Sequence, residues 1–154
     1  MAVTNMVYAS AVENFFKKQI DLDNDVIKVA LLHTYSFSVG HSTWADVKAT
    51  QITGTNYDHG AGGKVIAHTG GKIDVTDSII SFGKTASDTE WDESTITATH
   101  AVVYVYVDDE GSPNDASPLL CCINFDGEEK SASGMFKLEW DSNGIFRATV
   151  NPGG

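Results

Sequence analysis

The stretch TITATHAVVYVYV, residues Thr95 to Val107, decides the fold. From His100 onward it alternates with a period of two in β-branched and aromatic residues, without Gly or Pro, which is typical of a β-strand. One face carries Ala101, Val103, Val105 and Val107, and the other carries Val102, Tyr104 and Tyr106. Because both faces are apolar, we expect this strand in the middle of a sheet, covered on each side.

Shorter strand-like segments follow one another along the rest of the chain. They are expected at residues 26–33, 64–68, 72–76, 78–82, 119–125, 135–140 and 145–150. Fourteen Gly against three Pro also favour β-structure joined by turns. The sequence therefore predicts one all-β domain over residues 1–154, an antiparallel β-sandwich of about eight strands with one N-terminal helix. A jelly roll is the most natural eight-stranded choice.

Two short polar segments near the C-terminus are expected to be turns. The acidic and basic run DGEEK, residues 126–130, separates two predicted strands. The run DSNG, residues 141–144, contains Asn143-Gly144, which supplies the residues that a two-residue type I′ hairpin needs. We therefore expect residues 145–150 to pair with residues 135–140 as a hairpin.

The segment SAVENFFKKQI, residues 10–20, has the pattern of a helix. Ser10 is suited to cap its first turn and Glu13 to complete a capping box, while two lysines near its end suit the helix dipole. An apolar stripe at helical spacing is formed by Val12, Phe15, Phe16 and Ile20. We expect this stripe to pack on the core, with a binding groove as the alternative.

Two other segments are candidates for contacts with a partner. Residues 1–8 form an apolar arm that either pairs as an edge strand or reaches another subunit. Residues 35–63 are polar and Gly-rich, with a helical turn expected at 43–48, and are long for a bare connection. Glycines in 54–63 lack a phosphate-loop pattern and are expected to take positive φ in turns. The candidate partner-contacting residues are Val3, Met6, Val7, Tyr8, Trp44 and Tyr57.

Charge and cysteine content limit the function classes. Ten basic and 21 acidic residues give a net charge of −11, which disfavours nucleic acid and anionic membranes as partners. The acidity serves solubility, or it keeps crowded copies dispersed. Cys121 and Cys122 are adjacent and should point to opposite faces of a strand, as buried and unreactive thiols. No segment has the pattern of a membrane span or a signal peptide, so we expect synthesis in the cytoplasm, with neither secretion nor a membrane anchor.

The polar residues predict no catalytic, cofactor or metal site. The alternating carboxylates of residues 21–25 resemble a calcium loop, but Val26 and Leu32 stand where such a loop needs Gly and Glu. A cryptic site joining His41, Asp58 and His59 is an alternative, less favoured than unrelated surface imidazoles. We therefore do not expect an enzyme.

Aromatic residues in the loops leave one binding function open. Trp44, Tyr57 and Trp91 could line a shallow sugar site, as in a carbohydrate-binding β-sandwich module. In the other interpretation Trp91 and Trp140 belong to the core and only Trp44 lies at the surface.

Four segments together suggest a family. They are the helix followed by IDLDNDVIKVALL, then GTNYDHGAGGKVI, then EWDESTITATHAVVYV, and finally SPLLCCINFDGEEKSASGMFKLEWDSNGIFRATV. Their order resembles that of tailed-bacteriophage virion proteins, usually described as capsid decoration (cement) or minor structural proteins. The matching positions include Trp91, Ser94, Ala101, Tyr104, Phe125, Phe136 and Trp140, and Asn56 departs from the pattern where Gly is frequent.

The resemblance implies a non-enzymatic protein on the capsid surface of a virion. It would bind the outside of a phage head, stabilise contacts between major capsid protein subunits, and associate with copies of itself as a dimer or trimer. A tail or baseplate structural protein is the neighbouring alternative. No catalytic residue or cofactor is carried over from the family.

Overall fold

A computed structural model gives the structure of residues 4–150, which is β-rich with one α-helix. The all-β, sandwich-like fold predicted from the sequence is confirmed. The elements are β1 (Thr4–Val7), α1 (Ala9–Phe16), β2 (Ile27–Leu32), the 3-10 turns η1 (Trp44–Asp46) and η2 (Lys48–Thr50), β3 (Lys64–Val65), β4 (Ile73–Thr76), β5 (Ile79–Phe82), β6 (Thr89–Val105), β7 (Asp108–Asp109), β8 (Ser112–Pro113), β9 (Leu119–Leu138) and β10 (Phe146–Thr149).

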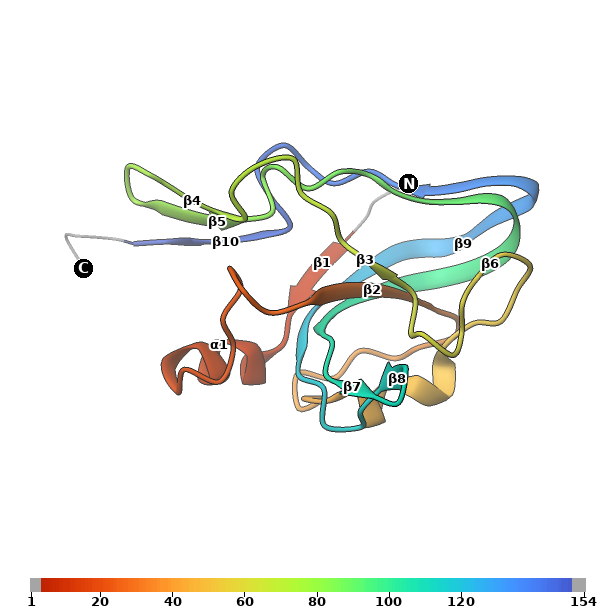
Figure 1. Ribbon diagram of the computed structural model, residues 1–154, viewed down its shortest axis with the longest axis horizontal. Coiled ribbons are helices and arrows are strands. Elements are labelled where there is room, and N and C mark those ends of the chain that lie inside the picture. Colours follow the sequence, from red (N-terminus) through yellow and green to blue (C-terminus); the bar gives the residue numbers. More distant parts are fainter. Residues whose placement is uncertain (1–3, 151–154) are drawn as a thin grey trace.

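The strands form three antiparallel sheets (Figure 1). Five strands pair in the order β1-β9-β6-β2-β3, three in the order β10-β5-β4, and β7 and β8 make a small hairpin in the predicted turn-rich connection. The described region thus has ten strands divided five, three and two, in place of about eight in a jelly roll. The extra strands are short pieces that a period-of-two pattern cannot detect.

A long ribbon of β6 and β9 contributes to both layers of the fold. The strands pair from Thr89 opposite Leu138 to Tyr104 opposite Leu119, with four register shifts between. Register shifts of this kind bend a ribbon and increase its twist. In Figure 1 the two strands curve together and return above the five-stranded sheet. One pair of strands therefore supplies the centre of the lower layer and part of its cover.

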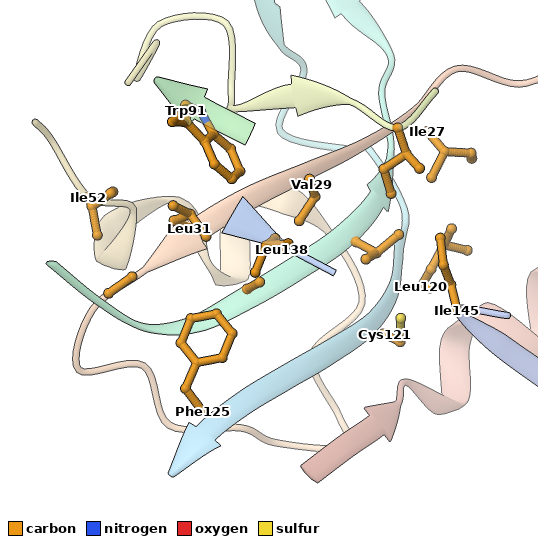
Figure 2. Close-up of a cluster of buried hydrophobic side chains, with 14 of the residues drawn as sticks. Ile27, Val29, Leu31, Ile52, Trp91, Leu120, Cys121, Phe125, Leu138 and Ile145 are labelled. Atoms are coloured by element: carbon orange, nitrogen blue, oxygen red, sulfur yellow. The ribbon is translucent and has the colours of Figure 1, made fainter. Parts of the chain in front are cut away.

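The predicted central strand lies inside β6, between β9 and β2, and both of its faces are buried as expected. Ala101, Val103 and Val105 belong to a core between the layers, whose other members include Trp91, Phe125 and Leu138 (Figure 2). Val102 and Tyr104 belong to a second cluster on the opposite face of the sheet. The strand ends two residues early, so Val107 is exposed.

Both predicted C-terminal turns need correction. Residues 126–130 do not separate two strands, because β9 runs through them with Asp126 and Gly127 at positive φ, where the ribbon bends. Residues 141–144 do turn, with Gly144 N donating to the Asp141 carbonyl at 2.9 Å. However, β10 then pairs with β5, so the predicted hairpin is wrong. The local residues are enough to form a turn, but the strand with which the following residues pair is determined by the tertiary fold.

The helix is shorter than predicted and lacks the predicted cap. It spans Ala9–Phe16, its N-cap is Tyr8, and the Ser10 hydroxyl is buried without a hydrogen-bond partner. Within the predicted stripe, Ile20 is buried and Phe15 packs on the core, but Val12 and Phe16 are exposed. The expectation that the whole stripe packs inside is therefore wrong.

The segment 35–63 packs on this chain itself. Tyr35, Trp44 and Val47 are buried in the second cluster, against Tyr104 and its neighbours. The predicted helical turn is present as η1 and η2. Residues 35–47 therefore cover the sheet face that the β6–β9 ribbon leaves open, whereas Ile52 and Tyr57 join the core between the layers.

Gly63 marks the tightest approach of this segment to the sheet. Its φ is +89°, as expected for a turn glycine, and a Cβ there would overlap the carbonyl oxygen of Val29. Gly111 has almost the same φ, +88°, and open space around it. An alanine would therefore introduce backbone strain at both positions, but steric overlap with a neighbouring atom only at Gly63.

We predict that Gly63→Ala lowers the free energy of unfolding by at least about 2 kcal/mol more than Gly111→Ala does. Both variants carry the strain of positive φ, about 1 kcal/mol, but only the first must displace the backbone of β2. Urea denaturation of the two variants measures the difference. Equal losses would show that the segment does not lie against β2.

Candidate interaction surface

The three-stranded sheet β10-β5-β4 has one apolar and one polar face. Residues that pair across antiparallel strands lie on the same face. The pairing places two rows on one face, Ile73–Phe82–Phe146 and Val75–Ile80–Ala148. The other face carries the rows Asp74–Ser81–Arg147 and Thr76–Ile79–Thr149. Every charged side chain of these three strands therefore lies on the second face.

In the first apolar row the rest of the molecule covers Phe82 and Phe146, while Ile73 at the end of the row is exposed. Phe82 is buried, and Phe146 stacks on it and on Phe15 of α1, with ring centroids 5.5 and 5.8 Å apart. In the second row Val75 and Ile80 keep 67% and 41% of their surface exposed. Figure 1 shows the sheet extending outward from the body. The apolar face is therefore bare where the sheet projects.

Helix α1 lies at the same end of the molecule and exposes a large apolar side chain. Phe16 is 85% exposed, although Phe15 beside it packs on the core. Val12, one helical turn earlier, is also exposed. A nearly bare phenylalanine on α1 and a bare sheet face at the same end of the molecule mark this end as a candidate contact surface. We call it the apolar end, defined by Val12, Phe16, Ile73, Val75 and Ile80.

Charged residues border the apolar end. Lys17 and Lys18 follow Phe16 directly, and Asp77 lies in the turn between β4 and β5, two residues after Val75. Among the described residues Lys17 pairs with Glu13, while Lys18 and Asp77 make no ion pair. A cation beside the helix and an anion beside the sheet are therefore both available to a partner.

The structure places the predicted partner-contacting residues mainly inside the molecule. Tyr8, Trp44 and Tyr57 are buried, and Trp44 stacks on Tyr104 with centroids 4.6 Å apart. Met6 is half-buried and Val7 is 43% exposed; Val3 lies outside the described residues. Residues 4–7 pair with β9, so the edge-strand alternative for the arm is confirmed there.

The aromatic residues proposed for a sugar site are also core residues. Trp91 is buried, as one interpretation predicted, and Trp140 is partly buried with its indole N–H donating to Thr89 Oγ1 at 3.1 Å. The expectation that Trp44 lies at the surface is wrong. Its side chain fills the space between η1 and the sheet, which a polar loop sequence does not reveal.

A buried chain of hydroxyl and imidazole groups was not predicted from the sequence. The hydroxyls of Tyr8 and Tyr35 share a hydrogen bond of 2.9 Å, and the Tyr35 hydroxyl meets His41 Nδ1 at 2.6 Å. Burial raises the pKa of both tyrosines. This chain joins β1 to the segment 35–63. Each of these buried polar groups thereby has a hydrogen-bond partner, and the bonds hold the segment against the rest of the chain.

The two cysteines lie on opposite faces, in separate apolar clusters, as predicted. Burial, with the neighbouring Cys122, raises the pKa of the Cys121 thiol to about 12. Burial likewise raises the pKa of Cys122 to about 12. Both thiols are therefore protonated and unreactive at neutral pH.

The structure does not bring together the residues of the alternative metal sites. His41 bonds to Tyr35, His59 Nδ1 meets the Ile52 carbonyl at 2.9 Å, and Asp58 accepts from the Ala61 N–H. Asp21 instead accepts the backbone N–H groups of the turn that it begins. Within residues 4–150, no group of three or more His, Cys, Asp or Glu is placed to hold a metal ion.

A groove of about 680 Å³ lies inside the bend of β9, beside β1. Its apolar lining includes Ile123, Phe125, Phe136, Leu138 and Ile145, and its charged lining includes Glu129, Lys130, Lys137, Glu139 and Asp141. Lys137 pairs with Glu139 at 3.2 Å and Asp88 at 3.8 Å. Three carboxylates and two lysines line the groove, and both lysines form ion pairs with carboxylates, so its lining identifies no particular ligand.

Comparisons with protein-family models, curated proteins and solved structures found no match. Of the helices in residues 4–150, none is both long and apolar enough to cross a membrane.

The Asp46 carboxylate stabilises the turn that begins η1, within the segment 35–63. Its carboxylate accepts from the backbone N–H groups of Ser42 and Thr43, at 2.8 and 3.1 Å. These bonds hold the pKa of Asp46 below its ordinary value of 3.8. A depressed folded-state pKa stabilises the fold above the unfolded-state pKa, and this stabilisation is lost as the pH falls through the folded-state pKa.

We predict that Asp46→Ala lowers the free energy of unfolding by about 1 kcal/mol at pH 7, since two backbone donors lose their acceptor. The difference from the parent should shrink as the pH falls below about 4. Urea titrations at several pH values measure it. A difference independent of pH would show that the Asp46 carboxylate does not hold this turn.

Proposed function

We propose that this chain is a structural protein of a tailed-phage particle, a decoration or cement protein that binds the outside of the head and links neighbouring subunits. The observation that carries the proposal is the apolar end, where Phe16, Val75 and Ile80 are exposed together on projecting elements. Such a surface is typical of a protein that works by adhering to other proteins.

The architecture suits that role. A continuous antiparallel ribbon, covered on both faces where it forms the centre of the five-stranded sheet, supplies a scaffold that can hold a contact surface in one position. The net charge of −11 keeps the free chain soluble despite its exposed apolar side chains. Many copies on a regular lattice also turn a modest contact into strong attachment.

The sequence resemblance supports the same proposal, and the structure gives its motifs a physical role. Trp91, Ser94, Ala101 and Tyr104 are buried positions of β6, and Phe136 packs opposite Trp91 with centroids 6.0 Å apart. These residues hold the bent ribbon together. The motifs therefore concern the fold, and the contact surface has to be argued separately, from exposure.

The N-terminal arm, residues 1–8, is a poorer candidate for the contact with the head than the apolar end is. Deleting residues 1–8 would remove β1 from the edge of the five-stranded sheet and Tyr8 from the second cluster. Such a variant would lose stability whether or not the arm touches a partner. Substitutions at exposed positions of the apolar end test the proposal without this complication.

The test is binding to heads of the encoding phage that lack this protein. We predict that the purified chain sediments with such heads up to a saturating number of copies. Val75→Asp should weaken binding at least about tenfold, because a charge would face an apolar contact. The matched control is Thr76→Asp, next in β4 but on the opposite face, and we expect near-normal binding from it.

Three outcomes would contradict the head proposal. The chain could fail to bind heads at any concentration, it could be found only in purified tails or baseplates, or the two variants could lose binding equally. Recovery from tails would support the neighbouring tail role. Binding to a glycan array by the isolated chain would instead support the carbohydrate-binding alternative.

A further inference from the structure

We propose that the groove beside β9 binds an extended segment of another protein, which adds a new strand along residues 135–141. The inference goes beyond the proposed function, because none of the residues that line the groove belongs to the apolar end. Every residue from Met135 to Asp141 lines the groove. Since successive residues of a strand point to opposite faces, a groove that touches all of them follows the edge of the strand, where the backbone lies.

This edge of β9 has no partner strand over most of its length among the described residues. β1 pairs with it only from Cys121 to Asn124, and β6 lies on the other side of β9. The backbone N–H and C=O groups of an unpaired edge are a template for another extended chain. The pairing of β1 shows that this edge accepts an added strand. Residues 125–138 continue the same edge around the bend of the ribbon.

The opposite edge of the bent-back ribbon, which belongs to β6, is covered by the protein itself. There the Thr95 N–H donates to the Thr55 carbonyl at 3.3 Å, and Asn56 Nδ2 donates to the Glu93 carbonyl at 3.1 Å. Apart from the ladder with β6, no group among the described residues bonds in this way to the backbone of residues 135–138. The open edges of β4 and β10 are only four residues long and belong to the sheet of the apolar end.

The groove also reaches the core between the layers. Phe136 and Leu138 line it from β9, and Phe125 and Ile145 complete its apolar lining, all four between 6 and 9% exposed. Apolar side chains on one face of an added strand would pack beside Phe136 and Leu138 as cross-strand neighbours. Those on its other face would meet solvent. The segment that fits is therefore one that alternates apolar and polar residues.

Charge favours a segment that carries a cation. Both lysines of the groove already form ion pairs, and Lys137 lies within 3.8 Å of Asp88, which precedes β6 on the side away from the open edge. Glu129 and Asp141 form no ion pair among the described residues, although Asp141 accepts the Asn143 N–H. A lysine or arginine of the segment would therefore meet an unpaired carboxylate. An acidic segment would be repelled by a chain of net charge −11.

Titration of the full chain with a fluorescein-labelled peptide tests binding. The peptide has about seven residues, to match residues 135–141 in length, and alternates valine with threonine and lysine. We expect saturable binding with a dissociation constant below about 1 mM. The same peptide with methylated amide nitrogens keeps its side chains but loses hydrogen-bond donors. It should bind at least about tenfold more weakly, because the strand is recognised through its backbone.

Two substitutions test the location of the site. Met135→Lys sets a like charge beside the lysines of the peptide and should weaken binding at least about fivefold, while the half-exposed side chain leaves the core intact. The matched control is Val65→Lys, at an exposed position of β3 on the far edge of the five-stranded sheet, and binding should stay within about twofold. Val75→Asp should also bind the peptide normally, so failure here and failure to bind heads are separate results.

Amide hydrogen exchange tests the geometry. In a strand paired on one side only, alternate amides point away from the partner, so every second amide from Gly134 to Leu138 should exchange fast in the free chain. The bound peptide should slow these amides and leave those of β4 and β5 unchanged. The inference would be overturned by no saturable binding, by equal binding of the methylated peptide, or by protection that omits these amides. Binding seen only after deletion of residues 1–3 would also overturn it, and would assign the groove to those residues.

Discussion

The hydrogen-bonded ribbon of β6 and β9 is the constraint on which the rest of the structure depends. Its two strands of 17 and 20 residues pair along nearly their whole length and bend together at register shifts. Bending lets one pair of strands form the centre of one layer and part of the other. The core between the layers is therefore closed by a single continuous element, and loss of the bend would separate the two layers.

The other elements can be understood as covers for surfaces that the ribbon leaves open. Residues 35–47 cover the outer face of the five-stranded sheet and are held there by the hydrogen-bonded chain of Tyr8, Tyr35 and His41. Helix α1 and the β10-β5-β4 sheet close one end through Phe15, Phe82 and Phe146. These contacts leave part of the helix and of the sheet face exposed to solvent, and the exposed part is the apolar end. The candidate contact surface is thus a consequence of how the core is closed.

Sequence patterns predicted what depends on local alternation and missed what depends on tertiary pairing. The run of alternating apolar residues around Val103 located the central strand and both of its buried faces. The polar residues around Gly127 have the composition of a turn, but in a long bent ribbon they are bulge residues with positive φ. Asn143-Gly144 does turn the chain, yet the strand that follows pairs with β5, far away in sequence.

The candidate site was the part least accessible to sequence. Trp44 is an aromatic residue in a polar segment, which suggested exposure, and only the packing of that segment on Tyr104 reverses the conclusion. Phe16 belongs to an apolar helical stripe, which suggested burial, but in α1 it is the neighbouring Phe15 that faces Phe146 and the core, and Phe16 points to solvent. A signal did exist in β4, where Ile73 and Val75 alternate with Asp74 and Thr76, but this local pattern does not indicate which face of the strand the rest of the protein covers.

Hydrogen exchange, read residue by residue, tests most directly the claim that the apolar end is a contact surface left open by a closed ribbon. In dilute solution the amides of β6 and β9 should exchange slowest, and those of β4, β5 and β10 should exchange faster. On the particle, exchange should slow in α1 and these three strands. Slowing confined to the groove of β9, or no change in β4 and β5, would contradict the account.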